Sequence, residues 1–125
     1  MALEKRLQSL AEEALILMRR PDTSVSVYLI SDSLMRELNF KYRRKDKPTT
    51  VLSFIEPQIP HPETDKKVLG EIYLAPRYIE KNKEDIDRLL IHGLLHLLGY
   101  DHTRKDDKIK MENKERDLAR RLLEP

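Results

Sequence analysis

The sequence predicts an α+β fold, a small and mostly mixed β-sheet packed against helices. Three short segments rich in β-branched residues, at 24–30, 49–55 and 68–75, read as strands, and amphipathic segments lie around them. The predicted order is α-β-α-β-β-α-α. The segment 86–98 is apolar on almost every side except at two histidines, which is typical of a helix buried at the centre of a fold. At this length, residues 1–125 are expected to form a single domain.

The first half of the chain begins with an amphipathic pattern over residues 2–20, and Pro21 is expected to end this helix. After the strand at 24–30, Asp32 or Ser33 can cap a second helix. This helix should end within the basic run "KYRRKDK" (41–47), because the residue before a proline is biased towards extended backbone.

The second half holds two strands and three helical segments. They are strands at 49–55 and 68–75, a short helical turn at 77–81, and helices at 86–98 and about 105–123. Residues 56–67 contain three prolines and are predicted to form a loop. Asn82 offers an N-cap for the apolar helix, with acidic residues in its first turn.

Composition limits the classes of function. Hydrophobic residues make up 39% of the chain, which favours a globular fold. Cysteine is absent, so a metal ion would be held by His, Asp or Glu. The net charge of +2 does not by itself indicate nucleic-acid binding. With no signal peptide and no membrane span in the sequence, we expect a cytoplasmic protein without a membrane partner.

The stretch "HGLLHLLGYDH" (92–102) carries three of the four histidines. His92 and His96 are four residues apart, so on a helix both imidazoles project from one face and can bind one Zn²⁺. Gly99 can turn the chain back in the left-handed conformation and bring His102 as a third ligand. Three protein ligands leave a fourth position open, as in catalytic zinc sites. The spacing therefore predicts one zinc ion per chain.

Gly93 separates this site from the zinc peptidases. In those enzymes a glutamate follows the first histidine and acts as general base, and here that position is Gly93. Glycine inside a helix costs about 1 kcal/mol relative to alanine. We therefore expect another backbone or a substrate to approach it closely, so that Gly93→Leu would damage activity more than folding.

Each of several other polar residues or segments allows two interpretations. The basic run 41–47 has five cations and one aspartate, and it either contacts RNA phosphates or forms a solvated helix end. Asp101 either accepts a hydrogen bond from a metal-binding histidine or belongs to a turn. Tyr100 either fills the core or stacks on a base. Glu71 points either towards the site or out to solvent.

Three segments carry a resemblance to a known family. "HGLLHLLGYDH" resembles the signature of the YbeY family of bacterial endoribonucleases, the rRNA maturation factors. "LNFKYRRKDKPTTVLSF" (38–54) is similar to its other signature, and "LGEIYLAP" (69–76) to a third strand in which Glu71 stands where Asp is usual. The similarity runs from about residue 23 to 115. The stretches 56–67 and 76–88 are short for the family.

The resemblance implies a metal-dependent endoribonuclease specific for single strands, active in 16S rRNA 3′-end maturation and ribosome quality control. It implies zinc ligands at His92, His96 and His102, and an important arginine at Arg43. The small ribosomal subunit and ribosome-assembly factors would be its partners. Two alternatives remain, namely a zinc hydrolase of peptides or small molecules, and a non-catalytic zinc protein of ribosome assembly.

The chemistry of RNA cleavage agrees with these residues. Zinc can lower the pKa of water to about 7, or polarise a phosphoryl oxygen and favour attack by the RNA 2′-OH, and both routes stay open. We expect Arg43 and His92 to be catalytic, with the Arg43 guanidinium bidentate on the scissile phosphate. Arg44, Lys45 and Lys47 are expected to contact neighbouring phosphates.

Overall fold

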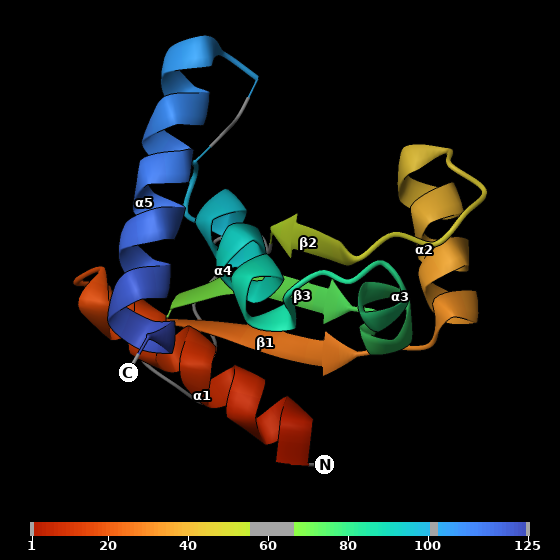
Figure 1. The fold of residues 1–125 in the computed structure, drawn as a ribbon, viewed down its shortest axis with the longest axis horizontal. Helices are drawn as coiled ribbons and strands as arrows, with labels where there is room; N and C mark the ends of the chain where they lie inside the picture. The colour runs from red at the N-terminus through yellow and green to blue at the C-terminus, as the bar shows by residue number, and fades with distance from the viewer. Residues whose placement is uncertain (1, 56–66, 101–102, 125) are drawn as a thin grey trace.

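The computed structural model describes residues 2–55, 67–100 and 103–124 (Figure 1). Their elements, in chain order, are α1 (Ala2–Leu17), β1 (Thr23–Leu29), α2 (Asp32–Arg43), β2 (Val51–Ile55), β3 (Lys67–Leu74), α3 (Pro76–Lys81), α4 (Ile86–Leu97) and α5 (Lys105–Leu123). The predicted α+β class is confirmed, and the element order differs from the prediction only by one added helix, α3, where a short helical turn was expected at 77–81.

The three strands form one mixed sheet with β3 at its centre, in the order β1-β3-β2. β1 pairs with β3 in parallel and β2 pairs with β3 in antiparallel orientation. Along β1, burial alternates from one residue to the next, with Val25 and Val27 buried. This alternation turns one face of the sheet towards the core.

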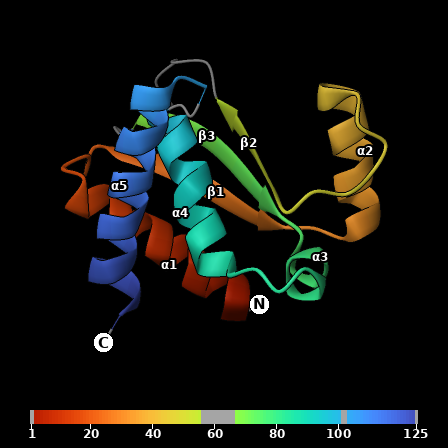
Figure 2. The same ribbon diagram turned by 45° about the horizontal axis from the view of Figure 1, so that its top comes forward.

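Helices α1 and α4 pack against this face, and α5 packs against α4 (Figures 1 and 2). Leu94 of α4 and Ile72 of β3 are completely buried in the same apolar cluster. The prediction of a central helix is therefore confirmed. Helices α2 and α3 lie beyond the ends of β1 and β3 (Figure 2). Within the part of the chain that the structure describes, no helix is long and apolar enough to cross a membrane.

The helix ends differ in detail from the predictions. The N-cap of α2 is Ser31, whose Oγ accepts a hydrogen bond from the Leu34 N–H at 3.1 Å, so the expected cap at Asp32 or Ser33 is wrong by one or two residues. The N-cap of α4 is Asp85 and not Asn82. Asn82 instead ends α3, where its side chain donates to the Tyr78 carbonyl. All these residue types can cap a helix, so composition alone does not choose among neighbours.

The helix α1 ends at Leu17, before the proline that was expected to end it. Arg19 follows with a φ of 60°, a left-handed conformation that breaks the helix ahead of Pro21. Gly99 has the predicted left-handed conformation after α4, with a φ of 97°.

Candidate active site

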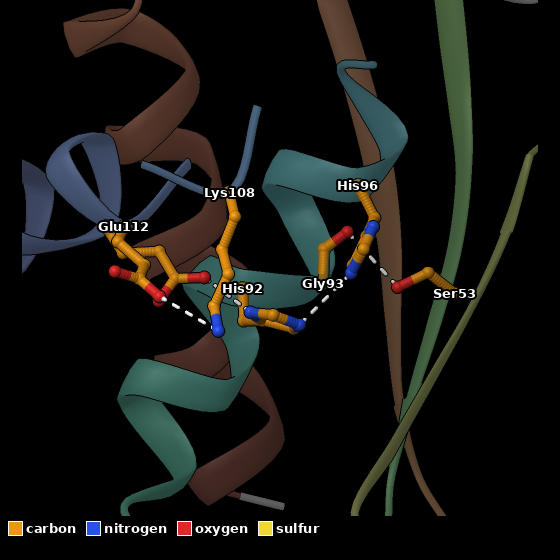
Figure 3. Close-up of polar contacts among 7 residues, drawn as sticks. Ser53, His92, Gly93, His96, Lys108 and Glu112 are labelled. Atoms are coloured by element: carbon orange, nitrogen blue, oxygen red, sulfur yellow. Dashed lines mark hydrogen bonds and ion pairs between the residues drawn. The ribbon is translucent and has the colours of Figure 1, made fainter. Parts of the chain in front are cut away.

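His92 and His96 lie one turn apart on α4, and their rings point to the same place (Figure 3). The two Nε2 atoms are 3.1 Å apart, and the ring planes make an angle of 81°. Two nitrogens that each bind a tetrahedral zinc at about 2.0–2.1 Å are separated by roughly 3.3 Å. The spacing of the Nε2 pair therefore fits a shared metal ion.

The histidine pair opens into a cleft of about 510 Å³ between α4 and the edge strand β2. Helix α2 contributes Arg43 to the same cleft. The residues that line it are Arg43, Val51, Leu52, Ser53, Ile55, His92, Gly93, His96 and Leu97. The structure thus brings Arg43 together with the two histidines, although they are far apart in the sequence. No carboxylate is among these described lining residues.

Gly93 is buried where α4 crosses the sheet. A Cβ at this position would lie 2.8 Å from Ser53 Oγ and 3.3 Å from methyl carbons of Ile72 and Val51. Ser53 Oγ also donates a hydrogen bond to the Gly93 carbonyl at 3.1 Å (Figure 3). The expected close approach is present, but it is made by strand side chains and not by another backbone. A larger residue at position 93 would therefore also disturb the packing of α4 on the sheet, and the expectation that activity suffers more than folding stays a prediction.

Glu115 reaches the other side of the His92 ring from α5. Its Oε1 lies within hydrogen-bond distance of His92 Nδ1. Both side chains are about one-third exposed, at 31% for Glu115 and 34% for His92. The imidazole of His92 is therefore held from Nδ1 while its Nε2 faces His96.

The basic segment after α2 is organised by Asn39, which is 1% exposed. Its Nδ2 donates to the Lys47 carbonyl at 2.8 Å, and its Oδ1 accepts from Arg43 Nη1 at 3.4 Å. Arg36 forms two hydrogen bonds with Asp46, which lower the pKa of that carboxyl below its usual value. These contacts fix the segment that carries the predicted phosphate-binding cations.

The predicted cations occupy two kinds of position. Arg43 lines the cleft, whereas Arg44, Lys45 and Lys47 are exposed on the segment that follows. Arg44 has a φ of 60° and closes α2 with a backbone hydrogen bond to the Phe40 carbonyl. The three exposed cations therefore lie within four residues of the cleft residue Arg43 along the chain.

Two predicted site residues, Asp101 and His102, lie outside the described residues. Within 2–55, 67–100 and 103–124, no three His, Cys, Asp or Glu side chains are grouped so that they could hold a metal ion. Of the three predicted ligands, His92 and His96 therefore lie within the described residues, and the role of His102 stays a prediction.

The remaining open interpretations involve Tyr100 and Glu71. Tyr100 is partly buried against the apolar cluster between α4 and α5, as expected for a core residue. Glu71 accepts a hydrogen bond from Tyr73 Oη at 3.1 Å. Its neighbour Ile72 faces α4, so Glu71 points to the opposite face of the sheet, away from the cleft. Burial and the Glu71 carboxylate raise the pKa of Tyr73 to about 12.

Two polar residues of the site region, Glu115 and Asn39, were missed from the sequence. In both cases a helical signal was available. Glu115 falls in step with the apolar residues Met111, Leu118 and Leu122 of α5, and Asn39 lies four residues after the buried Met35. A polar residue on the buried face of a helix requires a partner, because burying it alone costs free energy.

Known proteins are similar to this chain in sequence and in fold. A family model described as "Endoribonuclease YbeY" matches residues 1–123. A protein of that name from Wolbachia sp. subsp. Drosophila simulans (strain wRi) is 41% identical over 107 residues, which cover 79% of this chain and 69% of that protein. Another, from Anaeromyxobacter sp. (strain Fw109-5), is 38% identical over 124 residues, 93% of this chain. This chain spans 63% of the Anaeromyxobacter protein.

The fold is also similar to a solved structure, the solution structure of TM1509 from Thermotoga maritima. The TM-score is 0.64 at 30% sequence identity, and the match covers 97% of this chain and 81% of the other. The match of the family model over nearly the whole chain, together with these relatives, shows that the protein belongs to the YbeY family.

Proposed function

We propose that this protein is a zinc-dependent endoribonuclease that cuts single-stranded ribosomal RNA in the cytoplasm. Its proposed roles are 16S rRNA 3′-end maturation and ribosome quality control, with the small ribosomal subunit and assembly factors as partners. The observation that carries the proposal is the approach of the two Nε2 atoms, 3.1 Å apart, in a cleft that Arg43 also lines. The name of the relatives, endoribonuclease, supports the same reaction class.

The proposed zinc ligands are His92 and His96 through Nε2, with His102 as the third. When bound, zinc would supply Lewis-acid chemistry at the phosphodiester. Glu115 holds the His92 ring in place, and Ser53 ties the Gly93 carbonyl of the same helix to β2. These contacts keep the two ligands on a rigid element, as a catalytic metal site requires.

Arg43 is the proposed clamp for the scissile phosphate. Its guanidinium can donate two parallel hydrogen bonds to non-bridging oxygens and offset the charge that develops during phosphoryl transfer. The lining of the cleft favours RNA over peptides, because its described residues offer a guanidinium but no carboxylate to act as general base.

The test is cleavage of a single-stranded rRNA fragment by the zinc-loaded protein, with a duplex of the same sequence for comparison. His92→Ala should abolish cleavage. Arg43→Lys should reduce it by about 10- to 100-fold at equal folded fraction, because lysine keeps the charge but loses the fork. Arg77→Lys, an exposed arginine of α3, serves as the matched control and should leave the rate unchanged.

Two outcomes would contradict the proposal. Equal cleavage by the wild type and His92→Ala would indicate a contaminating nuclease. Tight binding of zinc and RNA without cleavage would indicate a non-catalytic assembly factor. The ends of the products identify the nucleophile, since attack by the 2′-OH leaves a cyclic phosphate and attack by water does not.

A further inference from the structure

Helix α5 contacts the histidine pair through a carboxylate, that of Glu115, which lies beside the proposed ligand His92. Glu115 Oε1 pairs with Nδ1 of His92, the ring nitrogen that does not face His96. The two nitrogens of one imidazole thus have separate neighbours, the Glu115 carboxylate at Nδ1 and the His96 ring at Nε2; Figure 3 shows the second contact.

Helix packing explains why this carboxylate lies there. Met111 and Leu118 of α5 are each 1% exposed and pack with Ile91 and Leu95 of α4. Glu115 lies on the same face of α5, between these two anchors, so the apolar contacts carry its side chain towards His92. Glu112, one turn earlier, has a side chain that is 52% exposed, and its Oε1 lies 4.0 Å from Lys108 Nζ.

The contact has a consequence for the protonation of the ring. A carboxylate accepts hydrogen bonds, so it favours the form of neutral imidazole that carries its proton on Nδ1. This form leaves the lone pair on Nε2, the atom 3.1 Å from His96 Nε2. Carboxylates that bind metal-ligating histidines in this way also fix ring orientation and raise ligand basicity.

We propose that Glu115 is a positioning residue, which holds His92 with its proton on Nδ1 and its Nε2 lone pair ready for the metal. The inference rests on the proposed function, since it assigns the metal to the histidine pair. It makes α5, which contributes no proposed ligand, a determinant of metal affinity.

The experiment compares Glu115→Ala, Glu115→Gln and the control Glu112→Ala. Zinc affinity is measured by competition with a chromophoric chelator, and the ring form of His92 by ¹⁵N NMR of the metal-free protein. Glu115→Ala should weaken zinc binding by about 10- to 100-fold. Glu115→Gln should lose less, because its amide oxygen still accepts from Nδ1–H, and Glu112→Ala should stay within about twofold of wild type.

The inference is overturned if Glu115→Ala binds zinc as tightly as Glu112→Ala, or if NMR finds the neutral His92 ring protonated on Nε2 in the wild type. The NMR result needs no variant, so it decides even if Glu115→Ala does not fold, which thermal unfolding would reveal. Neither readout depends on RNA cleavage. If the wild type binds zinc no better than His92→Ala, the proposed metal site itself fails.

Discussion

Gly93 has no side chain, and this allows α4 to pack closely against β2. The glycine lets the helix approach until Ser53 Oγ reaches the Gly93 carbonyl at 3.1 Å. His92, on the same turn, then opens into the cleft that β2 lines. The roughly 1 kcal/mol that glycine costs inside a helix is offset by this close packing. The sequence predicted that something packs closely against Gly93, because glycine is unfavourable inside a helix. It could not identify Ser53, because this residue lies on a strand distant in sequence.

Gly93→Leu tests this packing. The new side chain would collide with Ser53, Ile72 and Val51, so the free energy of unfolding should fall by about 1–3 kcal/mol in urea titrations. Ser53→Ala in the same chain should recover part of the loss, because it removes the nearest atom. A Gly93→Leu protein with wild-type stability and impaired cleavage would instead favour direct contact of this position with substrate.

At the scale of elements, the helices could be predicted from the sequence, but the partner of a polar residue on an apolar helix face could not. Periodicity predicted α1, α2, α4 and α5, and the spacing of His92 and His96 predicted their shared face. It did not identify the partner of Glu115 or Asn39, because that partner lies on another element or in a loop. Arg43 joined the predicted site through the family resemblance, since no local pattern links it to α4.

Asn39 offers a test of how α2 organises the basic segment. Asn39→Ala removes the hydrogen bond to the Lys47 carbonyl and the contact with Arg43, so it should lower the free energy of unfolding by about 1–3 kcal/mol. Amide hydrogen exchange should accelerate at residues 44–47. Arg36→Ala removes only an exposed pair with Asp46 and should cost at most about 1 kcal/mol. Equal effects of the two substitutions would contradict a special role for the buried amide.

Across the whole molecule, positive and negative charges nearly cancel. The chain has 24 Lys and Arg against 22 Asp and Glu, so its overall field towards RNA is weak. Affinity for a polyanion must then come from a local concentration of cations. The segment 41–47 supplies one, and the fold joins it to the cleft through Arg43.

Neutralising this segment should therefore weaken RNA binding far more than the same change of net charge elsewhere. We expect the combined variant Arg44→Gln, Lys45→Gln and Lys47→Gln to reduce the slope of log K against log salt by about 2, at roughly 0.7 per phosphate contact on a single strand. Fluorescence anisotropy with a labelled single-stranded RNA, at several salt concentrations, measures this slope.

The control carries three glutamines at exposed cations of α1 and α3, namely Lys5, Arg77 and Lys81. It has the same net charge as the test variant, so a global electrostatic effect would lower both slopes equally. A slope that falls only in the first variant locates the phosphate contacts on the segment after α2, next to Arg43. Equal slopes for the test and control variants would show that the basic segment does not contact RNA phosphates. Arg43 would then be a cleft residue without flanking phosphate contacts.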